Sequence, residues 1–521
     1  MNEPSPSVIT ELDAVDGAAA AEKGPASRGD TATRGASGGS SWRDWRGRRR
    51  GDAGLIAGVV AACLCLAAPL AVVFRAPTPG PVQSGASDVS SWSPSTAAGP
   101  WEASPHAHHA VDMVFGVARS WSGSEAGPSP LDAWASRRVL GIACAVVAAA
   151  SVGALAAIHS GSLAGVLALL VFASSPGWVR WIAYAPEAMV GPAAATLAVA
   201  LGLAGLRPWR AKTGVVRPAL AAIGGGAAMG LVALIDGWPG IAAVVLPLVL
   251  MTLTEPGRAS RLILIPVMSG VAALVLLSRL PSGPGDEAWL RAATGGLSAE
   301  SLARTADGLK LSAAWIGLWA LWTPAALLQA WSTSTQPSQR RRMLAAVAWP
   351  TGLLALAFAA PGSSVVFASL ISAWAVAIGV TLRQLHELCS EGRHPRLWRV
   401  TRWVCLAAVV AGTAAAPAVL YAPLRPEAWS GWGMPDRSAG VMAAAVLTLA
   451  ALSLLVGLST WRHHPARAAV ILAGYASTAV CLAPLTAMTG LLELESPVVL
   501  ETVRSAEAAL SPPAVSEGGG S

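Results

Sequence analysis

The densest group of side chains that could bind a metal ion or a phosphate lies in one polar segment, which holds His106, His108, His109 and Asp112. On a helix, His108 and His109 would each lie one turn before Asp112. Imidazoles and a carboxylate at that spacing could hold a divalent cation, and charged imidazoles could bind a phosphate. The alternative is an exposed polar loop. We assign the four residues to substrate binding and assign no residue to a metal site.

A second group combines a cation, a phenol and an acid at helical spacing: Arg180, Tyr184 and Glu187. On one continuous helix they would share a face. Arg180 could bind a phosphate through its planar fork of donors, or reach for lipid head groups as arginines near a membrane do. Pro186 suits a first helical turn, where the helix dipole favours Glu187 whatever its function. We expect Arg180 and Tyr184 to bind substrate and Glu187 to act in catalysis.

Two aspartates complete the candidates. Asp88 follows the end of the apolar run 54–74 by 14 residues and could act as a general base, or be a solvated acid in a Ser/Pro-rich loop. Asp236 ends another apolar run and opens the sequence DGWPG, which predicts a tight turn. Ionisable groups at membrane depth are candidates for function, whereas an acid at the interface needs none. We assign Asp88 to catalysis and Asp236 to substrate binding.

The composition indicates which kind of protein must position these residues. Of the 521 residues, 54% are hydrophobic and 12% are charged, and the mean hydropathy is +0.54. Soluble domains carry about 25% charged residues, so a soluble enzyme is excluded. The net charge of +7 comes from 33 Arg and 3 Lys scattered between apolar runs, which is typical of membrane loops rather than of a nucleic-acid-binding surface. The six cysteines show no metal or redox spacing.

Thirteen apolar runs predict an all-α, polytopic membrane protein with about 13 transmembrane helices. The runs are 54–74, 139–158, 161–175, 188–206, 219–235, 240–254, 262–279, 312–331, 343–359, 364–382, 403–421, 439–458 and 468–491. The segment 1–53 is a polar tail with too little apolar material to fold, 54–491 is the membrane domain, and 492–521 is a flexible tail.

The positive-inside rule sets the expected orientation. With the N-terminus in the cytoplasm and the C-terminus outside, the inner segments hold 24 of the 36 Lys and Arg residues. The protein is then expected in the inner cell membrane, with a large first outer loop at 75–138. The outer segment 280–311 has the charge spacing of an amphipathic interfacial helix.

Two further patterns predict packing. One apolar run is flanked or lined by Trp289, Trp315, Trp319, Trp322 and Trp331, and we expect interface anchoring rather than sugar stacking for such tryptophans. The triplet Gly224-Gly225-Gly226 lies inside a run and predicts close packing of helices.

Four segments resemble, in order, sequence elements of the GT-C superfamily of membrane glycosyltransferases. They are SRRVLG at 136–141, ASSPGWVRWIAYAPEAM at 173–189, GLVALIDGWP at 230–239, and the arginines 340–342 followed by two apolar runs around Pro361-Gly362. The chain looks most like the branch of protein O-mannosyltransferases and lipid A aminoarabinose transferases, over roughly 54–385. This resemblance implies about a dozen spans, a large first outer loop and a polyprenyl-phosphate sugar as donor.

The chain departs from the family at several charged positions. Asp88 alone stands where the family has a pair of acids, and Asp236 stands where the family's turn has a lysine. The sequence PHAHH at 105–109 stands where the family has Lys-Pro-Pro, and no lysine accompanies Pro361. The resemblance therefore implies either that His and Arg bind the donor phosphate in place of Lys, or that the chemistry has been lost.

We therefore predict a glycosyltransferase-like protein that moves a sugar from a polyprenyl-phosphate carrier to an envelope lipid, glycan or protein, without a cofactor or nucleic acid. A carboxylate would activate the acceptor, and cations would stabilise the leaving phosphate. One alternative is a non-catalytic homologue that binds lipid-linked sugar or scaffolds an envelope complex. A second is a transporter or flippase, although the few charges within the runs disfavour ion coupling. Sugar, acceptor and oligomeric state remain open.

Overall fold

The computed structural model describes residues 56–68, 130–184, 189–206, 216–253, 264–277, 299–331, 337–360, 363–392, 396–421 and 464–478, and parts of 449–457. All of them belong to one compact unit, Gly54–Ser521. The expected N-terminal tail, the tail 492–521 and most of the first outer loop lie outside the described residues. The last residues of that loop, from Pro130 on, already belong to a helix.

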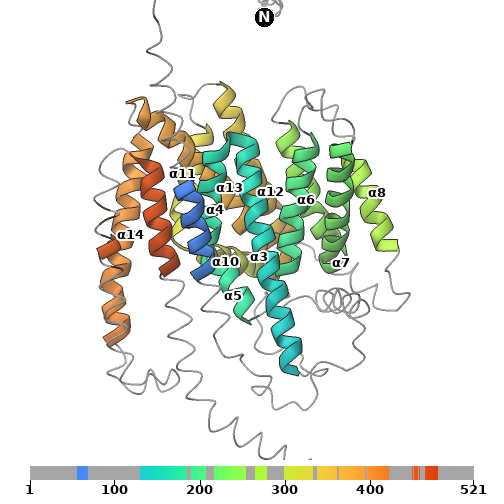
Figure 1. The fold of residues 1–521 in the computed structure, drawn as a ribbon, viewed down its shortest axis with the longest axis horizontal. Coiled ribbons are helices and arrows are strands. Elements are labelled where there is room, and N and C mark those ends of the chain that lie inside the picture. The colour runs from blue at the N-terminus through green and yellow to red at the C-terminus, as the bar shows by residue number, and fades with distance from the viewer. Residues whose placement is uncertain are drawn as a thin grey trace, which may run out of the picture. The chain divides into compact units, whose positions relative to one another are not determined.

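Nearly all the residues that the structure describes are helical, and no strand occurs among them. Each of the thirteen predicted runs overlaps helical residues, which confirms an all-α polytopic fold. The labelled helices (Figure 1) are α3 (Pro130–Ser160), α4 (Ser162–Ala173), α5 (Pro176–Tyr184), α6 (Val190–Leu206), α7 (Val216–Leu253), α8 (Leu264–Leu277), α10 (Ala299–Ile316), the 3₁₀ helix η4 (Gly317–Trp322), α11 (Thr323–Trp331), α12 (Pro337–Ala359), α13 (Ser364–Ser390) and α14 (Arg396–Tyr421).

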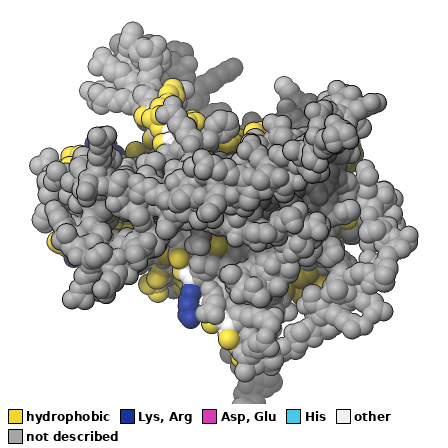
Figure 2. Space-filling model, turned by 90° about the horizontal axis from the view of Figure 1, so that it is seen from below, with side chains coloured by type: hydrophobic (Ala, Val, Ile, Leu, Met, Phe, Trp, Pro, Cys, Tyr) yellow, Lys and Arg dark blue, Asp and Glu magenta, His cyan; other side chains and the backbone are white. Residues whose placement is uncertain are grey.

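Five of these helical stretches are long and apolar enough to cross a bilayer, counted over the described residues alone. They are Val139–Ser160, Pro218–Thr252, Gly308–Trp331, Arg340–Ala359 and Val365–Ser390. Large apolar side chains point outward, as in Leu220 and Val400, which are 63% and 60% exposed. Most described side chains visible in Figure 2 are hydrophobic. Such a surface suits lipid as solvent, and the protein is a multi-pass membrane protein.

Helix α7 contains the predicted tight turn. Gly237 has φ 66° and ψ −141°, a conformation that glycine adopts without steric cost. A Cβ built on Gly240 would lie 2.7 Å from the carbonyl oxygen of Val232. Residues eight apart on a straight helix are about 12 Å apart along the axis. The chain therefore reverses here, and α7 consists of two legs, as the runs 219–235 and 240–254 predicted.

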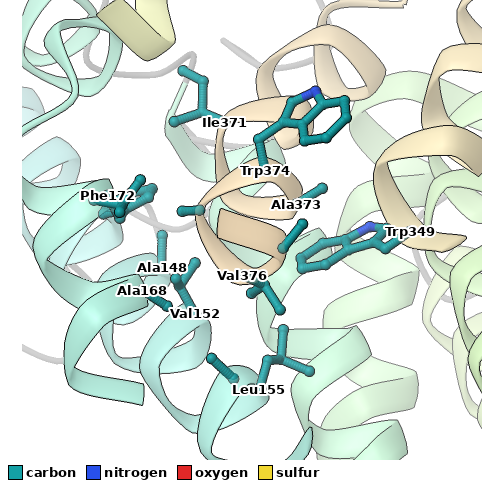
Figure 3. Close-up of a cluster of buried hydrophobic side chains, with 14 of the residues drawn as sticks. Ala148, Val152, Leu155, Ala168, Phe172, Trp349, Ile371, Ala373, Trp374 and Val376 are labelled. Carbon is teal, nitrogen blue, oxygen red and sulfur yellow. The ribbon is translucent and has the colours of Figure 1, made fainter. Parts of the chain in front are cut away.

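Helix α13 is the centre of the bundle. Every residue in the hydrophobic window of Val365–Ser390 is buried, and α13 contacts α3, α4, α6, α7, α10, α11 and α12. Trp374 and Val376 lie in the same buried cluster as Trp349 of α12 and Leu155 of α3 (Figure 3). A Cβ on Gly379 would lie 2.6 Å from the backbone nitrogen of Ala168, so α4 and α13 approach closely through small residues.

The glycine and tryptophan predictions fare differently. A Cβ on Gly226 would lie 2.8 Å from the carbonyl oxygen of Met268, which confirms close packing of α7 on α8 through the glycine triplet. The expectation of interface anchoring is wrong for Trp315, Trp319 and Trp322, which are at most 4% exposed and belong to the core. Trp331 at the end of α11 is 75% exposed, as an anchor would be, and Trp289 lies outside the described residues.

The segments predicted to face one side of the membrane gather at one end of the bundle (Figure 1). At one end, residues 191, 235–236 and 363–365 lie together, and we call it the Asp236 end. At the other, residues 160–162, 340–343 and 383–387 lie together, and we call it the Arg383 end. Helix α10 supplies the expected helix of the segment 280–311, beginning at Ala299. Its place at a membrane interface stays a prediction.

Candidate functional site

Asp236 is the predicted site residue whose side-chain contacts the structure describes. It is half-buried at the turn of α7, and its carboxylate accepts a hydrogen bond from the Ser363 hydroxyl. The backbone N–H of Val365 is a second donor to this carboxyl. These two donors fix the carboxyl group at the junction between the α7 turn and the start of α13.

The start of α13 explains why this carboxylate is accommodated. Ser363 is the N-cap residue, with extended φ −78° and ψ 108°, and its hydroxyl oxygen accepts from the backbone N–H of Val366 at 3.1 Å. The first N–H groups of a helix lack partners within the helix and form the positive end of its dipole. Asp236 therefore lies where α13 best stabilises an anion, and Ser363 holds the helix start and the acid together.

The sequence element at 173–189 begins with a buried structural contact. The indole N–H of Trp319 donates to the hydroxyl of Ser174 at 2.8 Å, and that hydroxyl donates to the carbonyl of Leu170 at 2.7 Å. A Cβ on Gly177 would lie 2.6 Å from side-chain atoms of Trp315. The small residues after α4 thus let α5 pack against α10 and η4. Sequence reasoning missed the Trp319–Ser174 pair.

Arg180 and Tyr184 both lie on α5, one helical turn apart, as their spacing predicted. The structure describes their backbone and not their side chains. Helix α5 contacts α3 and α10, and in the chain it precedes α6, whose start lies beside Asp236. The direction of the guanidinium and the phenol stays a prediction.

The start of α6 also lies beside Asp236. A Cβ on Gly191 would lie 2.5 Å from Val365, whose backbone N–H donates to Asp236, and 3.6 Å from Ile235, which directly precedes Asp236. Gly191 follows Glu187 by four positions in the chain. The start of α6, which lies at the Asp236 end, thus follows the predicted catalytic acid Glu187 closely in the chain.

The other predicted site residues lie outside the described part of the chain. They are Asp88, His106, His108, His109, Asp112 and Glu187. Among the described residues, no group of three or more His, Cys, Asp or Glu side chains could hold a metal ion. The structure thus brings Asp236 and the start of α6 to one end, and leaves the predicted catalytic acids as predictions.

This arrangement can perform limited chemistry by itself. A carboxylate has about four acceptor sites, and the Ser363 and Val365 donors leave capacity for a hydroxyl group of a ligand. Asp236 is therefore equipped to orient a polyol and the α13 start to stabilise negative charge nearby. Proton transfer and binding of a phosphate require the acids and cations predicted in neighbouring segments.

Taken together, the helical bundle with its α7 turn and its central α13 has the same fold as ArnT. Two solved structures carry that assignment. One is ArnT from Cupriavidus metallidurans bound to undecaprenyl phosphate, with a TM-score of 0.54 and 18% sequence identity; the match covers 86% of this chain and 80% of that one. The other is the same protein in its apo state, with a TM-score of 0.53 and 17% sequence identity; the match covers 83% of this chain and 77% of that one.

A third structure is the archaeal oligosaccharyltransferase AglB from Archaeoglobus fulgidus, with a TM-score of 0.41 and 13% identity. It matches 72% of this chain and 49% of that one, and adds nothing to the assignment. No protein-family profile matches the sequence, and no curated protein matches it. The resemblance predicted from the sequence is thus confirmed as a shared fold.

Proposed function

We propose that this protein transfers a sugar from a polyprenyl-phosphate donor to an acceptor at the Asp236 end of the bundle. The observation that carries the proposal is the ArnT-like fold over 86% of the chain, because the ArnT structure holds undecaprenyl phosphate. The convergence of the α6 start, Asp236 and the α13 start at one end supports it. The acceptor is an envelope lipid, glycan or protein.

The proposed reaction uses an acid as general base. Asp88 or Glu187 takes the proton from the acceptor hydroxyl as its oxygen attacks the anomeric carbon of the sugar. The bond between that carbon and the phosphate oxygen breaks, and polyprenyl phosphate leaves with the bonding pair. A single displacement of this kind inverts the configuration at the anomeric carbon.

The leaving phosphate gains negative charge, which cations must stabilise. Arg180 on α5 is the proposed partner, because its planar fork binds two phosphate oxygens at once. His106, His108 and His109 would add donors from the first outer loop, with Asp112 orienting them. Tyr184 and Asp236 would hydrogen-bond the sugar.

The proposed orientation puts this reaction outside the cytoplasm. The basic inner segments and the long outer segments favour a cytoplasmic N-terminus, so the Asp236 end would face outward in the inner membrane. The donor's head group lies at the boundary between water and lipid, and the Asp236 end would lie at that depth.

A second candidate is a non-catalytic protein that binds lipid-linked sugar. The observation that favours it is that Asp236 accepts hydrogen bonds from Ser363 and Val365. Asp236 stands where the family's turn has a lysine, and these bonds give the acid a structural role that needs no catalysis. Such a protein would bind the donor and leave it intact.

One experiment separates the two candidates. Proteoliposomes with the full chain are given a radiolabelled polyprenyl-phosphate sugar and an envelope lipid extract, and label transferred to acceptor is measured beside bound donor. Glu391→Gln is the control, since Glu391 is exposed at the Arg383 end.

Catalysis predicts transfer by the wild type and Glu391→Gln, and at least a hundredfold slower transfer by Asp88→Asn or Glu187→Gln, as general-base catalysis contributes about 10²–10⁴-fold. Equal transfer by all variants would remove both acids from the mechanism. Bound donor without transfer in the wild type would establish the second candidate.

A further inference from the structure

A second polar site lies at the Arg383 end, away from the proposed reaction. It is a half-open pocket between the end of α3, the start of α12 and the last turns of α13. Its lining residues are Ser160, Arg342, Met343, Val380, Arg383, Gln384 and Glu387. The pocket thus combines two arginines, an amide and an acid from α12 and α13 with a serine from α3.

Gln384 is the residue that points to a ligand. Its side chain is 4% exposed, and neither its amide nitrogen nor its carbonyl oxygen has a hydrogen-bond partner among the residues that the structure describes. A buried amide without partners costs free energy, which a ligand with matching groups would recover. Because Gln384 lines the pocket, such a ligand would need both an acceptor and a donor.

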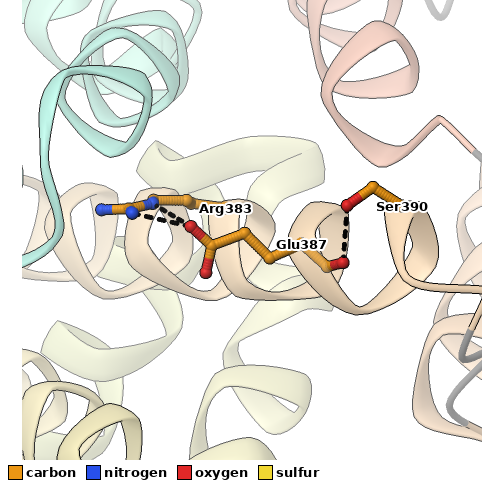
Figure 4. A network of polar contacts seen from close by, with 3 residues as sticks. All are labelled: Arg383, Glu387 and Ser390. Atoms are coloured by element: carbon orange, nitrogen blue, oxygen red, sulfur yellow. Dashed lines mark hydrogen bonds and ion pairs between the residues drawn. The ribbon is translucent and has the colours of Figure 1, made fainter. Parts of the chain in front are cut away.

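Arg383 is already oriented for binding. Its Nε donates to Glu387 Oε1 at 2.8 Å, and its Nη2 lies 2.6 Å from the same oxygen (Figure 4). A Cβ built on Gly161, which has φ +87°, would lie 2.9 Å from Nη1, so the guanidinium fits against a position where only glycine leaves room. Arginine has five N–H donors, and Glu387 leaves some of them for a ligand.

The charge of the pocket favours an anion. Arg342 and Arg383 against Glu387 leave one net positive charge, and Arg342 is exposed at the pocket. Basic pockets between transmembrane helices are suited to anionic lipid head groups.

We propose that this pocket binds a phosphate ester that also carries hydroxyl groups, as the head groups of anionic glycerophospholipids do. Arg342 and Arg383 contact the phosphate, the Gln384 amide donates to a phosphate oxygen, and its carbonyl accepts from a head-group hydroxyl. The proposal is independent of the proposed transferase reaction, because it concerns the opposite end of the bundle and is tested without an activity readout.

The test measures lipid binding by native mass spectrometry of the purified full chain in detergent. Dioleoyl phosphatidylglycerol and dioleoyl phosphatidylcholine are titrated separately. The wild type is expected to bind the first phosphatidylglycerol at least tenfold more tightly than phosphatidylcholine. Arg342→Gln and Gln384→Leu should each weaken phosphatidylglycerol binding by about tenfold, which corresponds to ~1.4 kcal/mol.

The matched control is Arg340→Gln, which removes the same charge from an exposed arginine outside the pocket lining. It should change binding less than twofold. Equal losses in Arg340→Gln and Arg342→Gln would overturn the proposal, because diffuse surface charge would then explain the binding. Unchanged binding in Gln384→Leu would also overturn it. If Gln384→Leu does not fold, the contrast between the two arginine variants decides.

A final arm separates the two sources of such a ligand. Glycerol 3-phosphate is added to the phosphatidylglycerol complex. Displacement of the lipid supports a site that takes the soluble ester as well, and retention supports a site that requires the lipid anchor. In both cases the proposal requires that Arg342→Gln weakens phosphatidylglycerol binding and that Arg340→Gln does not.

Discussion

Replacing Ser363 by alanine should destabilise the bundle more than any other single hydroxyl deletion on α13. The hydroxyl accepts from the Val366 N–H at 3.1 Å and donates to Asp236, and the side chain is 4% exposed. Loss of an N-cap costs about 1 kcal/mol. Loss of a hydrogen bond to a charged group costs about 1.5–3 kcal/mol, and the half-buried Asp236 favours the lower value. We expect Ser363→Ala to lower the free energy of unfolding by about 2.5 kcal/mol.

The control for this prediction lies on the same helix. Ser369 is fully buried, and its hydroxyl has no hydrogen-bond partner in the described part of the chain. Ser369→Ala should therefore change stability by less than about 0.5 kcal/mol or be stabilising. Unfolding is followed by tryptophan fluorescence, for which the 22 tryptophans suffice, during titration of mixed micelles with SDS.

A double-mutant cycle isolates the contact with Asp236. The variants are Ser363→Ala, Asp236→Ala and the combination, and we expect a coupling energy of about 1.5 kcal/mol. Additive effects of the two substitutions, or equal stabilities of the Ser363 and Ser369 variants, would refute the reasoning that Ser363 joins the α7 turn to the start of α13.

Three further predictions concern packing and topology. Gly379→Ala should cost about 1–3 kcal/mol, because the new methyl would meet the backbone of the neighbouring helix α4, whereas Gly270→Ala, with open space around it, should be neutral or stabilising in the same SDS titration. Trp319→Phe should cost about 1 kcal/mol more than Trp349→Phe, because Trp319 donates a hydrogen bond and the Trp349 indole has no partner in the described chain; equal losses would contradict this. In a cysteine-free background, Ala259→Cys should react with a membrane-impermeant maleimide in inside-out vesicles and not in intact cells, and the reverse pattern would invert the proposed topology.

Much of the helical framework was predictable because bilayer physics leaves few choices. A span must be a long apolar helix, so hydropathy alone located the thirteen runs. The α7 turn was predictable from DGWPG, since Gly237 supplies the positive φ that a reversal needs. The close approach of α7 to α8 followed from the glycine triplet, because small residues let helix backbones meet.

Contacts between distant segments were not predictable from local patterns. Ser363 lies 127 positions from Asp236, and Ser174 lies 145 positions from Trp319. A serine before the run 364–382 is an N-cap signal, so the start of α13 could have been found, but not its acidic partner. The burial of Trp319 likewise depends on which helices surround it, which is why the expectation of interface anchoring failed.

The candidate site is predictable to a smaller extent. The sequence grouped Arg180 with Tyr184, and the structure has them on α5, one helical turn apart. Gln384 carried no local signal, since glutamine in an apolar helix becomes informative only when its burial and missing partners are known.

The most direct test of the proposed function is an electron cryo-microscopy map of the full chain in nanodiscs with added undecaprenyl phosphate. The proposal predicts phosphate density at the Asp236 end, within reach of Arg180 and on the side of α13 that begins with Ser363. Phosphate density confined to the Arg383 end, or none at saturating lipid, would contradict it.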